Sequence, residues 1–197
     1  MPAVLSRLRA IALAVLAGLT VASCGYNAIP TLEESAKAQW AEVENQYQRR
    51  SDLIPNLVET VKGYANFEQK TLTDVIEARA DATKITVTPQ TLNDPEAFKK
   101  FEQAQGALTS ALSRLMAVSE RYPDLKANQS FLGLQAQLEG TENRIAVARR
   151  DYIKAVRDYN VRVRTFPGVI WAMIYGAHAK PEFTATEGAD KAPAVKF

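Results

Sequence analysis

Charged side chains occupy positions in the helical sequence pattern where apolar side chains are expected. Arg50 does so in the first predicted helix and Glu142 and Arg149 in the last, while Glu68 prolongs the first pattern. Because an unpaired buried charge is strongly unfavourable, these groups should find partners. We predict that Arg50 pairs with Glu142. Arg149 should lie nearby, since it follows Glu142 by two helical turns on the same face.

These charges have three possible interpretations. They can form a structural polar layer that fixes helix register, as buried polar residues do in coiled coils, and Asp52 and Arg79 could join it. They can form a ligand-binding or proton-handling site, because paired carboxylates perform acid–base chemistry; Glu68, Glu139 and Glu142 are the candidates. They can also lie on the surface. The carboxylates fall on helix faces and not in an open cleft, which favours the structural layer.

The chain contains one cysteine and one histidine. This count excludes an internal disulfide and a Cys/His zinc site, and it argues against thiol–imidazole catalysis. The sequence also has no glycine-rich phosphate loop, no serine-centred nucleophile elbow and no metal-ligand cluster. We therefore expect no enzyme activity, no cofactor and no metal.

The single cysteine, Cys24, ends an apolar N-terminal segment. Arg7 and Arg9 precede an apolar stretch of about 13 residues, which is short for a membrane span and typical of a signal peptide. Val21-Ala22-Ser23-Cys24 matches a lipobox, in which small residues admit the peptidase and the thiol accepts the lipid. We predict a signal peptide at 1–23, lipid attachment and a linker at 24–30, and an acylated Cys24 held in the membrane, for example by palmitate.

The alternative for this segment is an uncleaved transmembrane anchor. Both arrangements place the mature chain in the cell envelope, facing the periplasm or the extracellular side. Gly25 stands where an aspartate would favour inner-membrane retention in many Gram-negative bacteria, so the outer membrane is slightly favoured.

The elements that must position the charged layer are helical. Apolar residues recur at spacings of three and four over three segments, which predicts long helices at 31–83, 94–122 and 125–165. Asp94 and Pro95 form a helix start, and Pro55 should kink the first helix near Ser51. Short connections imply an up-down-up, elongated antiparallel bundle in an all-α fold, with the first and third helices parallel.

A short apolar segment, 169–175, follows Pro167-Gly168. It predicts a short C-terminal helix that closes one end of the bundle, or alternatively an exposed contact patch formed by Trp171, Ile174 and Tyr175. We place the bundle domain at 31–180. The polar residues that follow, 181–197, predict a disordered tail.

The bulk composition agrees with one folded domain. Hydrophobic residues make up 47% of the 197 residues and charged residues 23%. The net charge of +2 argues against nucleic-acid binding, which normally requires concentrated positive charge.

Several sequence blocks resemble the LemA family of bacterial membrane-associated proteins. The most specific is the run from Arg49 to Val58, which reads RRSDLIPNLV. The others are Tyr26-Asn27, Trp40, Val61-Lys62-Gly63-Tyr64-Ala65, Glu68, Ala78-Arg79, Tyr122-Pro123-Asp124-Leu125-Lys126-Ala127, Glu142-Asn143-Arg144-Ile145, Ala148-Arg149, Asn160 and Phe166-Pro167.

The resemblance implies an antiparallel helix bundle tethered to a membrane, with most of the protein outside the cytoplasm. It implies no reaction. The chain departs from many members in two places: Ile153 follows Tyr152 where they carry asparagine, and a lipobox stands where they carry a longer transmembrane helix.

Three functions are consistent with these features. The first is a non-catalytic envelope scaffold whose partner is another envelope protein or a second copy of the chain. The second is a membrane-surface sensor or remodeller that uses segment 169–175 as an insertion patch. The third is a hydrolase that uses the carboxylates on the helix faces.

Overall fold

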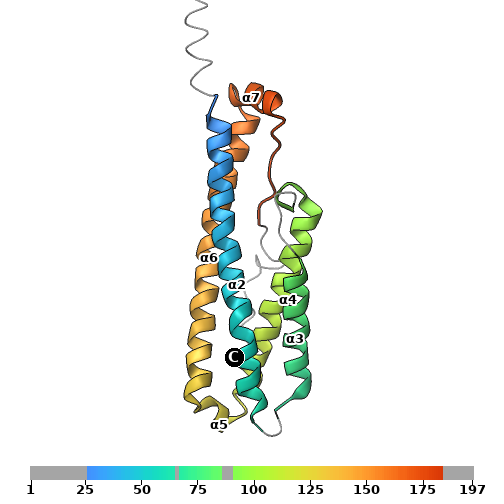
Figure 1. Cartoon of the computed structure of the whole chain (residues 1–197), viewed down its shortest axis with the longest axis vertical. Coiled ribbons are helices and arrows are strands. Elements are labelled where there is room, and N and C mark those ends of the chain that lie inside the picture. Colours follow the sequence, from blue (N-terminus) through green and yellow to red (C-terminus); the bar gives the residue numbers. More distant parts are fainter. Residues whose placement is uncertain (1–25, 65–66, 86–90, 184–197) are drawn as a thin grey trace, which may run out of the picture.

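The computed structural model describes residues 26–64, 67–85 and 91–183, which form an elongated helical bundle (Figure 1). The described residues contain no strand, so the predicted all-α bundle is confirmed. The elements are α2 (Ala28–Lys62), α3 (Gln69–Lys84), the 3-10 turn η1 (Thr91–Asn93), α4 (Pro95–Ser119), α5 (Pro123–Lys126), α6 (Gln129–Arg164) and α7 (Gly168–Tyr175).

The predicted first helix, 31–83, is wrong in its extent, because two antiparallel helices occupy this stretch (Figure 1). α2 ends at Lys62 with Gly63 as its C-cap, and Glu68, in extended conformation, precedes α3. Val61 and Leu72 both pack into the same core, so the apolar face of α3 folds back towards that of α2. The apolar periodicity continues through both helices, and periodicity alone therefore did not reveal the turn.

This extra turn reverses the relation between the first and last long helices. α2 and α6 are antiparallel, not parallel as the up-down-up interpretation required. Near one end Tyr64 accepts a hydrogen bond from Asn128 at 2.7 Å, and further along, the rings of Trp40 and Tyr152 lie 5.0 Å apart. The residue numbers of the contact partners in α6 therefore decrease as the residue numbers in α2 increase.

Other helix boundaries follow local capping. Asp94 caps α4 as predicted, and its Oδ1 accepts from the backbone N–H of Glu96 at 2.9 Å. α4 ends at Ser119, short of the predicted 122. The last long helix begins at Gln129 and not at 125, because Asn128 caps it by accepting from the N–H of Phe131 at 3.1 Å.

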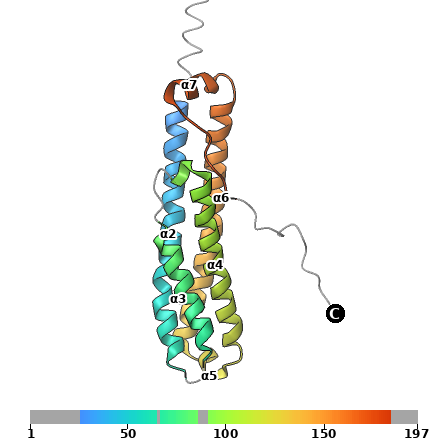
Figure 2. The ribbon, with the colours of Figure 1, turned by 90° about the vertical axis from the view of Figure 1, so that its right-hand side faces the viewer.

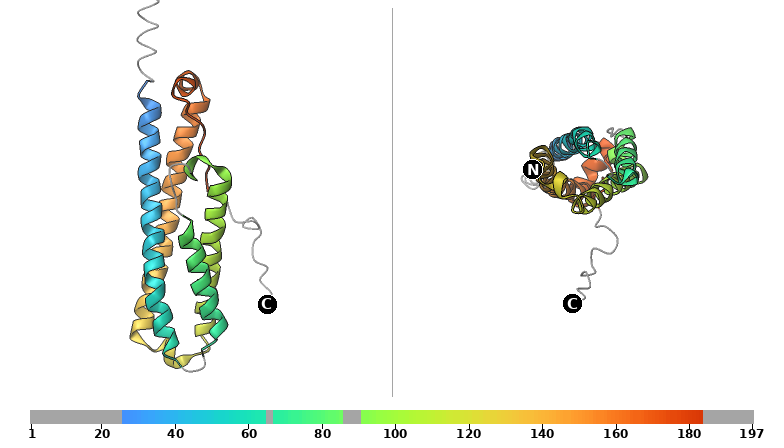
Figure 3. Two further views of the ribbon diagram at one scale, coloured as in Figure 1. Left: turned by 45° about the vertical axis from the view of Figure 1, so that its right-hand side comes forward. Right: turned by 90° about the horizontal axis from the view of Figure 1, so that it is seen from below.

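The bundle has an incomplete four-helix cross-section. Figure 3 shows that α3 and α4 cover only part of the length of the α2–α6 pair, and Figure 2 shows α7 at the end they leave uncovered. None of the described helices is both long and apolar enough to cross a membrane. Residues 1–25, with Cys24 and the predicted signal peptide, lie outside the described residues.

Two main clusters of buried side chains fill the bundle. The aliphatic core lies where all four long helices meet, and the aromatic core lies nearer to α7. The aliphatic core comprises Ile54, Leu57, Val58, Val61, Phe67, Leu72, Val75, Ala82, Leu108, Ala111, Leu112, Leu115, Val118, Leu125, Phe131 and Leu138. The aromatic core comprises Ala36, Trp40, Val43, Tyr47, Leu92, Phe98, Phe101, Ile145, Ala148, Tyr152, Ala155, Val156 and Phe183.

The C-terminal segment 177–183, which we call the strap, packs along the bundle. The tail predicted from residue 181 therefore begins too early, since Phe183 is only 8% exposed and its ring contacts that of Phe98. Asn160 holds the strap by donating to the carbonyl of Lys180 at 2.9 Å and accepting from its N–H at 2.8 Å. The buried ammonium of Lys180 reaches Glu33 at 3.1 Å. Residues 184–197 lie outside the described residues.

Candidate functional site

Arg50 is the centre of a buried polar layer between the two cores. Its side chain is 1% exposed and extends from α2 across the bundle. Nη1 donates to Oε1 of Glu142 on α6 and to Oγ1 of Thr109 on α4, both at 2.8 Å. Nη2 donates to the side-chain oxygen of Gln105 on α4 at 2.5 Å. Charge-assisted bonds of this kind tie three helices to one guanidinium.

The layer reaches the fourth helix through Gln105. Its side-chain amide donates to the carbonyl of Ala82 on α3 at 3.5 Å. On the other side, the guanidinium of Arg50 lies 5.0 Å from the ring centre of Tyr47. Burial raises the pKa of the Tyr47 hydroxyl, an effect that the positive charges of Arg149 and Arg50 partly oppose. The Tyr47 hydroxyl therefore stays neutral beside the arginine.

The structure contains the predicted pair of Arg50 and Glu142, but the geometric premise was wrong. The pairing was argued from a parallel arrangement of the first and last long helices, whereas α2 and α6 are antiparallel. The pair forms because Arg50 on α2 and Glu142 on α6 lie at the same height along the bundle. Glu142 is 38% exposed, so one partner of the ion pair is close to solvent.

Arg79 joins this region through the backbone. Pro55 has no N–H, so the carbonyl of Ser51, four residues earlier, lacks its normal helical donor. Nε of Arg79, on α3, donates to that carbonyl at 2.9 Å. An arginine on the neighbouring helix thus replaces the hydrogen bond that the proline removes.

The other predicted members lie outside the layer. Asp52 is exposed and accepts from Gln48 at 2.7 Å, and Glu68 is exposed and pairs with Arg121 at 2.9 Å. Glu68 lies outside because α2 ends at Lys62, before the pattern suggested, and Asp52 lies on the exposed face of α2. Arg149 lies one level closer to α7, 3.6 Å from Glu102 and with its guanidinium 4.2 Å from the ring centre of Phe183.

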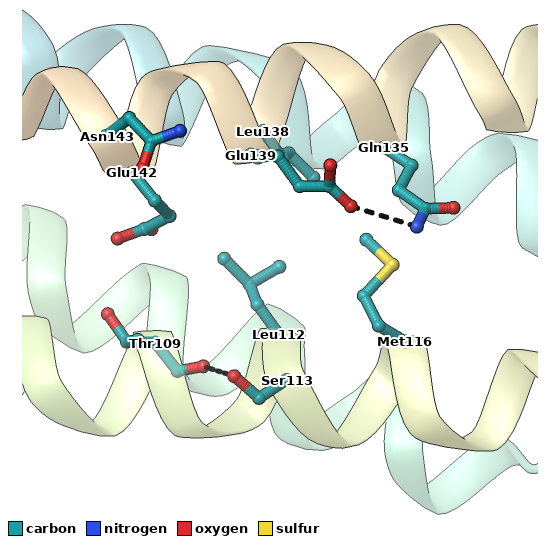
Figure 4. A pocket seen from close by; sticks show the side chains of 9 residues that line it. All are labelled: Thr109, Leu112, Ser113, Met116, Gln135, Leu138, Glu139, Glu142 and Asn143. Atoms are coloured by element: carbon teal, nitrogen blue, oxygen red, sulfur yellow. Dashed lines mark hydrogen bonds between the residues drawn. The ribbon is translucent and has the colours of Figure 1, made fainter.

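A groove opens beside the polar layer, between α4 and α6 (Figure 4). Its volume is about 400 Å³. Leu112, Met116 and Leu138 supply its apolar surface, and the carboxylates of Glu139 and Glu142 lie along the α6 side (Figure 4). The remaining lining residues are Thr109, Ser113, Gln135 and Asn143. The groove can receive an apolar side chain flanked by a cation.

Sequence reasoning missed the partners Gln105 and Thr109 and the groove. A glutamine and a threonine beside an apolar seam give no signal of their own, and a groove depends on how far two helices stand apart. Among residues 26–64, 67–85 and 91–183, no cluster of three potential metal ligands is present.

The third predicted site, in segment 169–175, lies at the end of the bundle where α2 begins (Figure 2). Trp171 is half-buried, and its ring packs edge-on against Tyr26 at 5.4 Å. Tyr175 donates to the backbone carbonyl of Tyr26 at 3.1 Å. Ile174 is 64% exposed and makes part of an apolar surface.

Together these features define an elongated all-α bundle protein, with a buried arginine layer and a groove at the level of that layer. The sequence model of the LemA family matches residues 39–197, and the chain therefore belongs to the LemA family.

Individual relatives share less than a third of their aligned residues with this chain. The chain is 28% identical over 180 residues to the magnetosome protein MamQ of Magnetospirillum gryphiswaldense and to MamQ 2 of Paramagnetospirillum magneticum. Each alignment covers 83% of this chain and 66% of the relative. Protein LemA of Metamycoplasma hominis is 26% identical over 119 residues, 60% of this chain and 50% of that protein. The chain thus spans from half to two thirds of the length of these relatives.

Proposed function

We propose that the protein is a non-catalytic interaction protein of the cell envelope, tethered to a membrane by an acylated Cys24. The observation that carries the interaction role is the groove between α4 and α6. The groove is open to solvent and combines an apolar floor with the carboxylates of Glu139 and Glu142, which also bind Gln135 and Arg50 within the fold. These features suit a protein segment that presents an apolar side chain and a lysine or arginine.

The tether rests on the sequence of residues 1–24. A lone cysteine follows a short apolar run and two small residues, as lipid attachment requires. The bundle would then face the periplasm, with the outer membrane slightly favoured, or the extracellular side. Mass spectrometry of the mature N-terminus tests this part: an unmodified thiol with residues 1–23 retained would overturn it.

The groove is tested by photo-crosslinking in intact cells. A photoreactive residue at Ser113 lies in the groove, and the same residue at Ser110, an exposed serine on α4 outside the groove, is the matched control. We expect a discrete crosslinked partner, identified by mass spectrometry, from position 113 only. Equal products from both positions, or none from position 113, would contradict the proposed groove.

The same groove distinguishes binding from hydrolysis. Glu139 and Glu142 are one helical turn apart and both line it, so acid–base chemistry is the alternative role for these two carboxylates. If the groove is a binding site, Glu142→Gln should weaken crosslinking to the partner, and neither the wild-type protein nor the variant should cleave an envelope substrate. Cleavage of an envelope substrate by the wild-type protein, lost in Glu142→Gln, would instead establish an enzyme.

A further inference from the structure

The end of the bundle that carries α7 has an apolar surface that the fold leaves uncovered. Four large apolar side chains form it, and we call it the α7 face: Phe166 and Met173, each 79% exposed, with Ile170 and Ile174. Three of them recur at helical spacings of three and four, while Ala172 points into the bundle and is buried. α7 is therefore apolar on both sides, unlike a surface helix of a water-soluble domain.

The position of α7 is fixed by close backbone packing. A side chain at Gly168 would collide with the carbonyl oxygen of Arg162, so α7 lies directly against the last turn of α6. Gly176 ends the helix in the left-handed conformation at φ 62°, and the N–H of Ala177 donates to the carbonyl of Ala172 at 2.8 Å. The α7 face is thus held in one orientation at the end of the bundle.

We infer that the α7 face inserts into the interfacial region of the same lipid bilayer that holds the anchor, an inference that rests on the proposed tether. The start of the described chain packs on α7, since Tyr26 contacts both Trp171 and Tyr175. Cys24 precedes Tyr26 by two residues, which span at most about 7 Å. An acylated Cys24 therefore brings the bilayer surface to α7.

The residues around the α7 face match the chemistry of that interface. Tryptophan and tyrosine concentrate where the hydrocarbon meets the headgroups, and Trp171, Tyr175 and Tyr26 gather here. Arg162 and Arg164 form the basic last turn of α6, next to α7, where they can contact anionic headgroups. The α7 face itself carries no charge.

A second attachment point changes what the tether does. An acylated residue in a linker would let the bundle rotate freely about one point. A rigid apolar face at the same end restricts the angle between the bundle and the membrane, because tilting would withdraw it from the interface.

The test measures burial at the α7 face in the full-length, membrane-reconstituted protein. Ile174→Cys carries a polarity-sensitive fluorophore, and Val147→Cys, an exposed apolar position on α6, is the matched control. In phosphatidylethanolamine–phosphatidylglycerol vesicles we expect a blue-shifted emission and several-fold weaker iodide quenching at position 174. The label at 147 should quench as it does in solution. Vesicle flotation, run in parallel, reports the tether separately.

The outcomes separate the two proposals. Flotation with equal quenching at 174 and 147 would overturn the insertion of the α7 face and leave the tether intact, whereas no flotation would overturn the tether. Shielding at 174 that disappears when each vesicle holds one protein copy would assign the α7 face to self-association and overturn the inference. Loss of shielding on the further change Met173→Ser, with flotation unchanged, would support it.

Discussion

The two halves of the bundle are stabilised by different means. Where four helices meet, helix packing encloses the aliphatic core except along the groove between α4 and α6, which Leu112 and Leu138 line. Towards α7 the helix α3 is absent and α4 contributes only its first turns, so large aromatic rings and the strap fill the remaining space beside α2 and α6. Trp40 alone contacts four other rings, those of Phe98, Phe101, Tyr152 and Phe183. A bundle with fewer helices thus compensates with larger side chains and a non-helical segment.

The largest expected effect comes from the layer that joins the halves. Arg50→Ala removes the cation that Glu142, Thr109 and Gln105 bind and opens a cavity beside both cores. We expect a loss of about 3–5 kcal/mol in the free energy of unfolding, from this cavity and from the buried acceptors left without a donor, measured by urea denaturation. Hydrogen exchange should accelerate in both halves.

Glu142→Gln is the matched control for this change. It keeps a hydrogen-bond acceptor for Arg50 but removes the carboxylate that pairs with this buried guanidinium, so its cost should be smaller, about 1–2 kcal/mol. A similar loss for both variants would show that the charge of Glu142, and not the burial of Arg50, stabilises the layer.

The next effect should be confined to the half near α7. Phe183→Ala removes the ring through which the strap enters the aromatic core, at an expected cost of about 3 kcal/mol. Amides of the strap and of the α7 end should exchange faster, while those around Leu115 in the aliphatic core should stay protected. Uniform acceleration throughout the bundle would contradict the division into two halves.

A smaller effect concerns the hydrogen bond from Arg79 that replaces the backbone donor missing at Pro55, in the four-helix half. Arg79→Met leaves the carbonyl of Ser51 without its donor and should cost about 1–2 kcal/mol. Pro55→Ala supplies a backbone N–H to the same carbonyl. In that background Arg79→Met should therefore cost less, and a double-mutant cycle of thermal or urea denaturation measures the difference. Additive costs would refute the replacement of one donor by the other.

The smallest effect concerns pH and the aromatic half. Burial, with Glu182 as a second cause, raises the pKa of Tyr152 above its ordinary value of 10.0. Above pH 10 the unfolded chain releases this proton more readily than the folded chain, so stability falls as pH rises. Tyr152→Phe should change stability little at pH 7 and should flatten the decline above pH 10. An unchanged alkaline slope in urea titrations would contradict this.

Sequence periodicity predicted much of the fold because apolar spacing directly reflects burial. The apolar helix faces that contain Trp40, Leu108 and Tyr152 are buried as expected, and Asp94 caps its helix. The turn between α2 and α3 was missed because both helices continue one periodic pattern. The strap was missed because a single phenylalanine in a polar segment, Phe183, carries no periodicity at all.

The polar layer shows a different limit. A charged side chain on the apolar face of a helix indicates that it must have a partner, and this reasoning identified Arg50 and Glu142. It does not specify helix direction, so a correct pair was reached from a parallel arrangement that the fold does not have. Glu68 was included because the apolar pattern was extended past the true end of α2, and Asp52 because it stands two residues from Arg50; both are surface positions.

The antiparallel course of α2 has a consequence for the reach of any partner. Twenty-two residues separate Ala28 from Arg50, which at 1.5 Å per residue is about 33 Å. With α7 resting on the bilayer, the groove would stand at least this far above the headgroups. A membrane-embedded protein without a domain of comparable height could not enter it, so the molecule would admit tall or freely diffusing partners and exclude short ones.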